Sequence, residues 1–241
     1  MMISSGAVPS KGKSLNRVRK HKYAILLAAL IWVALVESFS HRPVLGPILS
    51  DLTIVAVMLL VFLIVFDRWL NRLVAFIALA TVAVAVFFAH YVLPPSDSQV
   101  PLRLVYHTAA LVLVGFATLV ILRNIFRQRI VGTDDVLGAV CGYLLAAGAW
   151  SNLLMLSEIF MPGSFTLGPA FDAEIDTSHG RIAVSSYVSL GSLTSVGSGA
   201  VVPIRPPATV LTTLEAVFGQ FYIAVVVAQL VGAKLSQARA S

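Results

Sequence analysis

The sequence predicts an all-α membrane protein with six transmembrane helices and a short re-entrant helix and loop between helices five and six. Three observations support this fold class. Hydrophobic residues make up 58% of the 241 residues and charged residues only 12%, whereas a soluble domain usually carries about 25% charged residues. The apolar residues gather in six runs of about 20 residues, the length that crosses the hydrocarbon core. A seventh run is much shorter and leads into a loop with two glycines.

The six apolar runs are separated by polar or proline-containing turns. Residues 1–21 are polar and basic and are expected to form a tail before the first run. That first run has about 18 residues and no small-residue cleavage site after it, which favours a span over a cleaved signal peptide. The spans are expected at residues 23–39, 48–66, 73–93, 102–122, 136–156 and 207–232.

Residues 158–180 interrupt the apolar pattern and are expected to form a polar loop outside the membrane. They include two prolines and the acids Asp172, Glu174 and Asp176. The run 181–193 that follows is too short to cross a bilayer. Non-helical backbone at membrane depth is tolerated where protein buries it or where it lines a water-filled path. The sequence therefore predicts a re-entrant helix at 181–193, followed by a loop that meets this condition.

The distribution of basic residues predicts the orientation, because cytoplasmic loops carry an excess of lysine and arginine. With the N-terminus in the cytoplasm, 13 of the 17 lysines and arginines fall on the cytoplasmic side and the other 4 on the outer side. Both termini are then expected in the cytoplasm, and the loop after residue 193 enters from outside.

That loop carries the most informative motif of the chain, T-S-V-G-S-G at residues 194–199. Alternating glycines let a backbone adopt φ values that other residues avoid, so that successive carbonyl oxygens can point the same way. The stretch resembles the selectivity filter of the potassium-channel superfamily, whose usual pattern is T-T-V-G-Y-G-D. Thr194, Val196, Gly197 and Gly199 match this pattern, and Ser195 keeps the hydroxyl of the second threonine. The resemblance to bacterial channels of this superfamily extends from residue 135 onward.

The resemblance implies a homotetrameric potassium or cation channel in a bacterial inner (plasma) membrane, with no cofactor besides the permeating ion. Four loops would surround one axis and bind a monovalent cation through the carbonyls of Ser195, Val196, Gly197 and Ser198. The helix 181–193 would be a pore helix, with its partly negative C-terminus toward the axis. The regions implied are a cytoplasmic basic tail at 1–21, a four-helix membrane domain at 22–134, a pore domain at 135–232 and a short cytoplasmic tail at 233–241.

Two departures from the family pattern bear on selectivity. Ser198 stands where the family has a tyrosine that packs outward against the pore helix, and Ala200 stands where an aspartate ties the loop to residues behind it. A loop without these supports is expected to be looser. It would prefer cations but discriminate less between potassium and sodium, or conduct little at rest. The alternative is that other side chains support the loop.

Three residues of the last span are candidates for pore support or gating: Glu215, Gly219 and Gln220. An ionisable residue inside a span is a functional hypothesis by default. Glu215 is expected to hydrogen-bond to hydroxyls such as those of Ser189 or Ser192, either in gating or as a structural support. Gly219 is expected to be a bend point or a site of close packing.

Several functions are disfavoured. Residues 104–122 contain no lysine or arginine, so the fourth helix is not a voltage sensor. No basic-aromatic patch for nucleic acid stands out, and the nine residues after Gly232 leave no room for a domain that binds a small-molecule ligand. Cys141, the single cysteine, is expected to be a packing residue. An intramembrane serine protease is disfavoured because Val196 stands where that class needs glycine, and no enzyme is predicted.

Two alternatives to a conducting channel stay open. One is a channel-fold protein that does not conduct and acts in assembly or regulation. The other is a small secondary transporter, although no internal repeat stands out. His90, His107 and His179 are expected near the outer side, either as a pH-sensitive cluster or as ordinary residues of the membrane interface.

Overall fold

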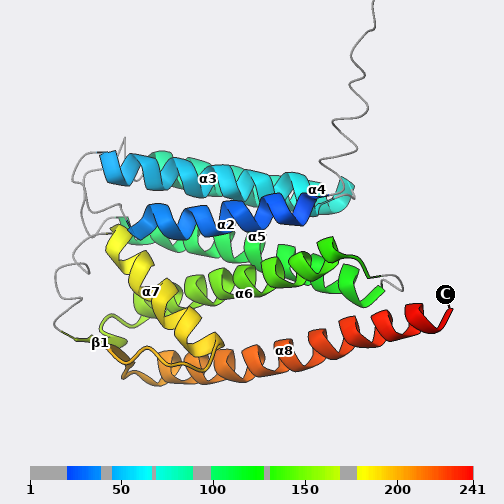
Figure 1. Cartoon of the computed structure of the whole chain (residues 1–241). Coiled ribbons are helices and arrows are strands. Elements are labelled where there is room, and N and C mark those ends of the chain that lie inside the picture. The colour runs from blue at the N-terminus through cyan, green and yellow to red at the C-terminus, as the bar shows by residue number, and fades with distance from the viewer. Residues whose placement is uncertain are drawn as a thin grey trace, which may run out of the picture.

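The computed structural model describes residues 21–38, 45–66, 69–88, 99–127, 131–168 and 178–240. Within these ranges the chain is mostly helical, as the apolar runs predict (Figure 1). The helices are α2 Lys22–Ser38, α3 Leu45–Val65, α4 Trp69–Phe87, α5 Val100–Arg127, α6 Thr133–Phe160, α7 Ser178–Leu193 and α8 Pro206–Ala240, and the strands are β1 Phe165–Leu167 and β2 Val201–Pro203.

Four helices in the described ranges are long and apolar enough to cross a membrane, namely α4, α5, α6 and α8. The chain is therefore a membrane protein. α2 and α3 contribute shorter apolar helices, Lys22–Val36 and Leu52–Val65, so a six-span topology stays a prediction. The expected ends of the first and third spans, residues 39 and 93, lie outside the described residues. The segment after residue 232, expected as a short tail, continues α8 as far as Ala240.

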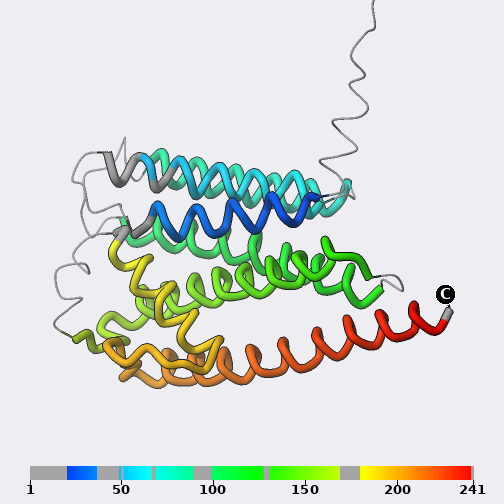
Figure 2. Tube along the Cα trace, viewed as in Figure 1, coloured from blue at the N-terminus to red at the C-terminus, as the bar shows by residue number. Residues whose placement is uncertain are grey.

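The helices form a bundle around α5 and α6, which pack along each other (Figures 1 and 2). α4 packs against α5, α2 lies against α3 and α6, and α7 lies between α6 and α8. The first turn of α2 and the last turn of α8 lie at one end of the bundle, whereas α7 begins at the opposite end (Figure 1).

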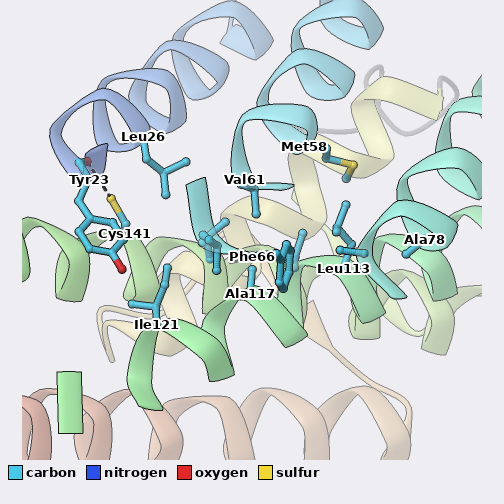
Figure 3. Packing of buried hydrophobic residues seen from close by; sticks show 14 of the residues in the cluster. Tyr23, Leu26, Met58, Val61, Phe66, Ala78, Leu113, Ala117, Ile121 and Cys141 are labelled. Carbon is cyan, nitrogen blue, oxygen red and sulfur yellow. Dashed lines mark hydrogen bonds between the residues drawn. The ribbon is translucent and has the colours of Figure 1, made fainter. Parts of the chain in front are cut away.

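The core between α2, α3, α5 and α6 is apolar and closely packed (Figure 3). Phe66 and Leu113 are fully or almost fully buried in it. Cys141 is also buried, and its thiol lies 3.4 Å from the Tyr23 carbonyl oxygen. This confirms the prediction that Cys141 is a packing residue. A Cβ at Gly138 would come within 2.9 Å of the Tyr23 ring, so the absence of a side chain at Gly138 lets α2 and α6 approach closely.

A short antiparallel strand pair, β1 and β2, closes the end of the bundle from which α7 starts. Phe165 pairs with Pro203 and Leu167 pairs with Val201. The Glu158 carboxylate accepts hydrogen bonds at 2.8 Å from the N–H groups of both Gly163 and Ser164, which fixes the turn into β1. The expectation of an all-α chain missed this pair, because strands of three residues are too short to leave an alternating pattern in the sequence.

Candidate functional site

The loop at residues 194–199 leaves the C-terminus of α7 in a tight turn. The Thr194 N–H donates to the Leu190 carbonyl at 3.0 Å, and the Ser195 N–H donates to the Ser192 carbonyl at 2.9 Å. Ser195 has a φ of 58° and Gly197 a φ of 84°. Positive φ is uncommon for a residue with a side chain and often marks a functional position.

Positive φ therefore occurs at two residues of the loop, and they are not the two glycines that the motif predicted. Gly197 is one of the two positions, and the other is Ser195 rather than Gly199. The four residues Thr194 to Gly197 are exposed, and Val196 has 84% of its surface accessible.

Two glycines, Gly191 and Gly219, let the loop and the end of α7 lie close to the backbone beside them. The Gly197 N–H donates to the Gly191 carbonyl at 3.0 Å, and a Cβ at Gly191 would come within 2.8 Å of the Gly197 oxygen. On the other side, a Cβ at Gly219 would overlap the Leu193 carbonyl oxygen. Tyr143 of α6 donates from its hydroxyl to that same carbonyl at 2.9 Å. The contact favours close packing over a bend point as the role of Gly219.

Gln220 connects α8 to the loop directly. Its side-chain Nε2 donates to the Ser195 hydroxyl oxygen at 2.9 Å. This bond fixes the orientation of the Ser195 hydroxyl. A shift of α8 would move that oxygen.

Glu215 lies fully buried between α7, α8 and α6. The Ser189 hydroxyl contacts both the Ala147 carbonyl oxygen, at 2.7 Å, and Oε1 of Glu215. A hydroxyl has a single proton, so Ser189 can donate to only one of these two oxygens. If Ser189 donates to Ala147, the contact with Glu215 is a hydrogen bond when a protonated Glu215 is the donor. The contact ties α8 to α7 in either case. The bond to Ser189 is as predicted, and the alternative partner Ser192 is not used.

One of the expected carbonyl ligands is engaged within the chain, because the Ser198 carbonyl accepts the Val201 N–H at 2.8 Å. The Gly197 carbonyl oxygen lies close to Gly191 of α7. The Ser198 hydroxyl donates to the Val201 carbonyl at 2.7 Å, so it supports the loop locally and does not reach α7. The Gly168 N–H donates to the Ala200 carbonyl at 2.6 Å and links the end of the loop to β1.

The structure thus brings the predicted residues of the loop together with Glu215, Gly219 and Gln220 at the C-terminal half of α7. Sequence reasoning missed Gly191 and Tyr143. The glycine inside the short helix, S-L-G-S at residues 189–192, was a signal for close backbone approach that was not used. Tyr143 left no such signal, because tyrosines occur throughout the apolar runs.

Of the three histidines expected near the outer side, His107 is the one whose side chain the structure describes. His107 is not at an exposed interface, since it is 4% exposed and lies 2.9 Å from Asn152 Oδ1 through its Nδ1. His90, the side chain of His179 and the acids at 172, 174 and 176 lie outside the described residues.

Comparison of the chain with protein-family models, with curated proteins and with solved structures found no match.

Proposed function

We propose that this chain is a subunit of a tetrameric cation channel in which the loop at residues 194–199 forms the ion filter. The observation that carries the proposal is the alternation of positive φ at Ser195 and Gly197 in a loop that is exposed on one side and held by α7 and α8 on the other. Backbone oxygens of such a loop can replace the water around a cation when several chains contribute them.

Four copies are needed because one loop cannot surround an ion. The exposed side chain of Val196 and the exposed apolar residues of α8, including Leu214 and Phe221, supply surface for neighbouring copies. In the proposed orientation both termini are cytoplasmic and the β1–β2 pair is external, in a bacterial inner membrane. The first turn of α2 and the last turn of α8 lie at one end of the bundle, which is compatible with this orientation (Figure 1).

The second candidate is a channel-fold protein that does not conduct and acts in assembly or regulation. The engagement of the Ser198 carbonyl by the Val201 N–H favours it, because that oxygen is not free to face an axis in this conformation. The two candidates differ in whether binding of an ion turns this carbonyl outward.

Cation flux from proteoliposomes distinguishes the candidates. Vesicles loaded with potassium and holding the full chain should release it faster than empty vesicles. Vesicles loaded with sodium should release it as well, so that the ratio of potassium to sodium flux is lower than is usual for the potassium-channel superfamily. Replacing Gly197→Ala should slow release by at least about tenfold, because a side chain at positive φ costs about 1–2 kcal/mol in each of the four copies.

Gly232→Ala is the matched control for the flux assay, since nothing lies within 4 Å of a Cβ at that glycine. It should leave release unchanged. If the unmodified tetramer releases neither cation, the conducting proposal is wrong and the second candidate holds.

A further inference from the structure

A cavity of about 500 Å³ lies beside α7, between that helix and α2, α3, α5 and α6. This volume is within the range of small-molecule sites in proteins, and such sites are lined mainly by apolar side chains with a few placed polar groups. Most of the wall is aliphatic, with contributions from Leu30, Ile54, Val57, Val114, Leu144 and Leu190. The polar residues of the lining come from α5, α6 and α7 and are Tyr106, His107, Ser151, Asn152, Ser185 and Ser186.

The cavity reaches the outer surface of the bundle at α2. Ile31 and Leu35 belong to its lining and also expose 50% and 51% of their surface, so they form an apolar rim. In a membrane protein an exposed aliphatic side chain matches the hydrocarbon of the lipid, which is as apolar as leucine. A molecule dissolved in the bilayer can therefore enter the cavity from the side.

At the polar end of the cavity, His107 offers an acceptor. Asn152 Nδ2 donates to the Gly148 carbonyl at 2.8 Å, so Oδ1 is the atom that faces His107 Nδ1 at 2.9 Å. An amide oxygen only accepts, and Nδ1 must then carry the proton of this bond. In a neutral imidazole the other nitrogen, Nε2, carries none. Nε2 is thus an acceptor for a group that brings its own proton.

Ser186 offers a donor at the same end. The hydroxyl oxygens of Ser151 and Ser185 lie 2.9 Å apart and bond to each other within the wall. Ser186 lies 3.3 Å from the Ser151 oxygen, which is long for a bond between two hydroxyls. Its proton is therefore the one most easily given to a ligand. Ser151 and Asn152 are neighbours on α6, so the contacts of Ser186 and His107 fall at one end of the cavity.

The lining carries no charged side chain that would select a charged ligand. Over the described residues it contains no lysine, arginine, aspartate or glutamate. Burial of an unpaired charge costs much more than burial of a polar group that finds a hydrogen bond. The complementary group is therefore neutral, and it both donates to Nε2 and accepts from Ser186. A hydroxyl does both, whereas an ether or a carboxylate cannot donate and an ammonium cannot accept.

We propose that the cavity binds a neutral membrane lipid whose headgroup is a free hydroxyl. The hydroxyl lies at the His107 and Ser186 end, and the hydrocarbon lies along the aliphatic wall. An apolar chain suits the wall because hydrophobic burial is non-directional and scales with area. The two hydrogen bonds fix which end of the lipid enters the polar part of the cavity. Binding of this lipid does not depend on whether the protein conducts ions.

Photolabelling tests the proposal. The full-length protein in phosphatidylcholine nanodiscs is exposed to a hexadecanol analogue with a diazirine in its chain, and labelled peptides are mapped by mass spectrometry. Label should concentrate on the cavity-facing segments of α3 and α7. Unlabelled hexadecanol should compete at a concentration at least about tenfold lower than palmitate, hexadecylamine, hexadecane or the methyl ether of hexadecanol, because each of these lacks a hydrogen bond or adds a charge.

Two matched pairs of variants locate the site. Val57→Trp fills the cavity from α3 and should lower labelling about tenfold, whereas Leu59→Trp, at an exposed position of the same helix outside the lining, should not. Ser186→Ala should weaken competition by hexadecanol several-fold and leave competition by hexadecane unchanged. Ser192→Ala, outside the cavity on the same helix, should change neither.

Palmitate that competes better than hexadecanol would show that the ligand is an anion and would overturn the proposal. Equal competition by hexadecane or by the methyl ether would overturn the role of the polar end. Label spread over exposed faces such as that of α4, and unaffected by Val57→Trp, would overturn the site itself. The Ser186→Ala result keeps the proposal testable if the tryptophan variant fails to fold.

Discussion

At the scale of single residues, the site depends on backbone positions that accept no side chain. Gly219 lets α8 touch the Leu193 carbonyl, and Gly191 lets the loop touch α7. Glycine inside a helix costs up to about 1 kcal/mol relative to alanine. A glycine suits a helix where the close contact that it allows stabilises the fold by more than this cost. Gly191 and Gly219 both allow such a contact.

Gly219→Ala is expected to lower the thermal midpoint of the protein in detergent, because the added methyl group must displace the Leu193 backbone. Overpacking of this kind costs about 1–3 kcal/mol. Gly232→Ala, on the same helix in open space, should be neutral or stabilising. Equal effects of the two changes would show that the contact at Gly219 is not tight.

Glu215→Gln is expected to be tolerated. If Glu215 is a neutral acid that donates to Ser189, the glutamine amide can donate in its place, and the free energy of unfolding should change by less than about 1 kcal/mol. Glu215→Ala leaves a cavity and should cost about 2–5 kcal/mol, the range for truncation of a large buried side chain. Thermal unfolding of both variants checks this prediction. A glutamine variant as unstable as the alanine variant would show that Glu215 is not a neutral acid.

Gln220 and Ser195 are expected to be energetically coupled. In a double-mutant cycle with Gln220→Leu and Ser195→Ala, the coupling should be about 1 kcal/mol, the usual net value of one hydrogen bond. The cycle can be read from the thermal stability of the assembled protein and, if it conducts, from the ratio of potassium to sodium flux. Strict additivity would mean that α8 does not hold the loop.

At the scale of elements, α7 is the piece on which the site is built. It is held from α6 by Tyr143 and the Ala147 carbonyl and from α8 by Glu215, and its C-terminus presents the loop. The β1–β2 pair closes the other end of the loop through Gly168. The end of the loop is therefore supported by a strand pair.

The orientation of these elements can be tested with introduced cysteines. The native Cys141 is buried, so it should contribute little labelling of its own. Met161→Cys, after α6, is expected to react with a membrane-impermeant thiol reagent added outside intact cells. Leu235→Cys, near the end of α8, should react only after permeabilisation. Both parent side chains are exposed in the structure. Labelling in the reverse pattern would show that the chain has the opposite orientation in the membrane.

At the scale of the whole molecule, the sequence predicted the helices well and the site in part. Apolar runs are long-range signals, and each of the six expected spans coincides with a helix over most of its length in the described residues. The ends of α5 and α8 extend further than hydropathy indicated, because charged and polar residues also form helix beyond the apolar run. The motif located the loop, but not the positive φ at Ser195.

What the sequence could not supply depends on tertiary contacts. The hydrogen bond from Tyr143 to Leu193 joins residues 50 positions apart, and the bond from Gln220 to Ser195 joins residues 25 apart. The β1–β2 pairing links two three-residue segments across α7. No local pattern encodes such pairs, so they become visible only in the fold.

Native mass measurement of the intact protein in mild detergent shows whether several copies of the loop can meet at one axis. We expect a complex with the mass of four 25.7 kDa chains. The substitution Val196→Glu, at the exposed face of the loop, should lower the fraction of tetramer because it brings four charges together. A stable monomer under conditions that keep the protein folded would rule out the proposed channel, because no complete filter could then form.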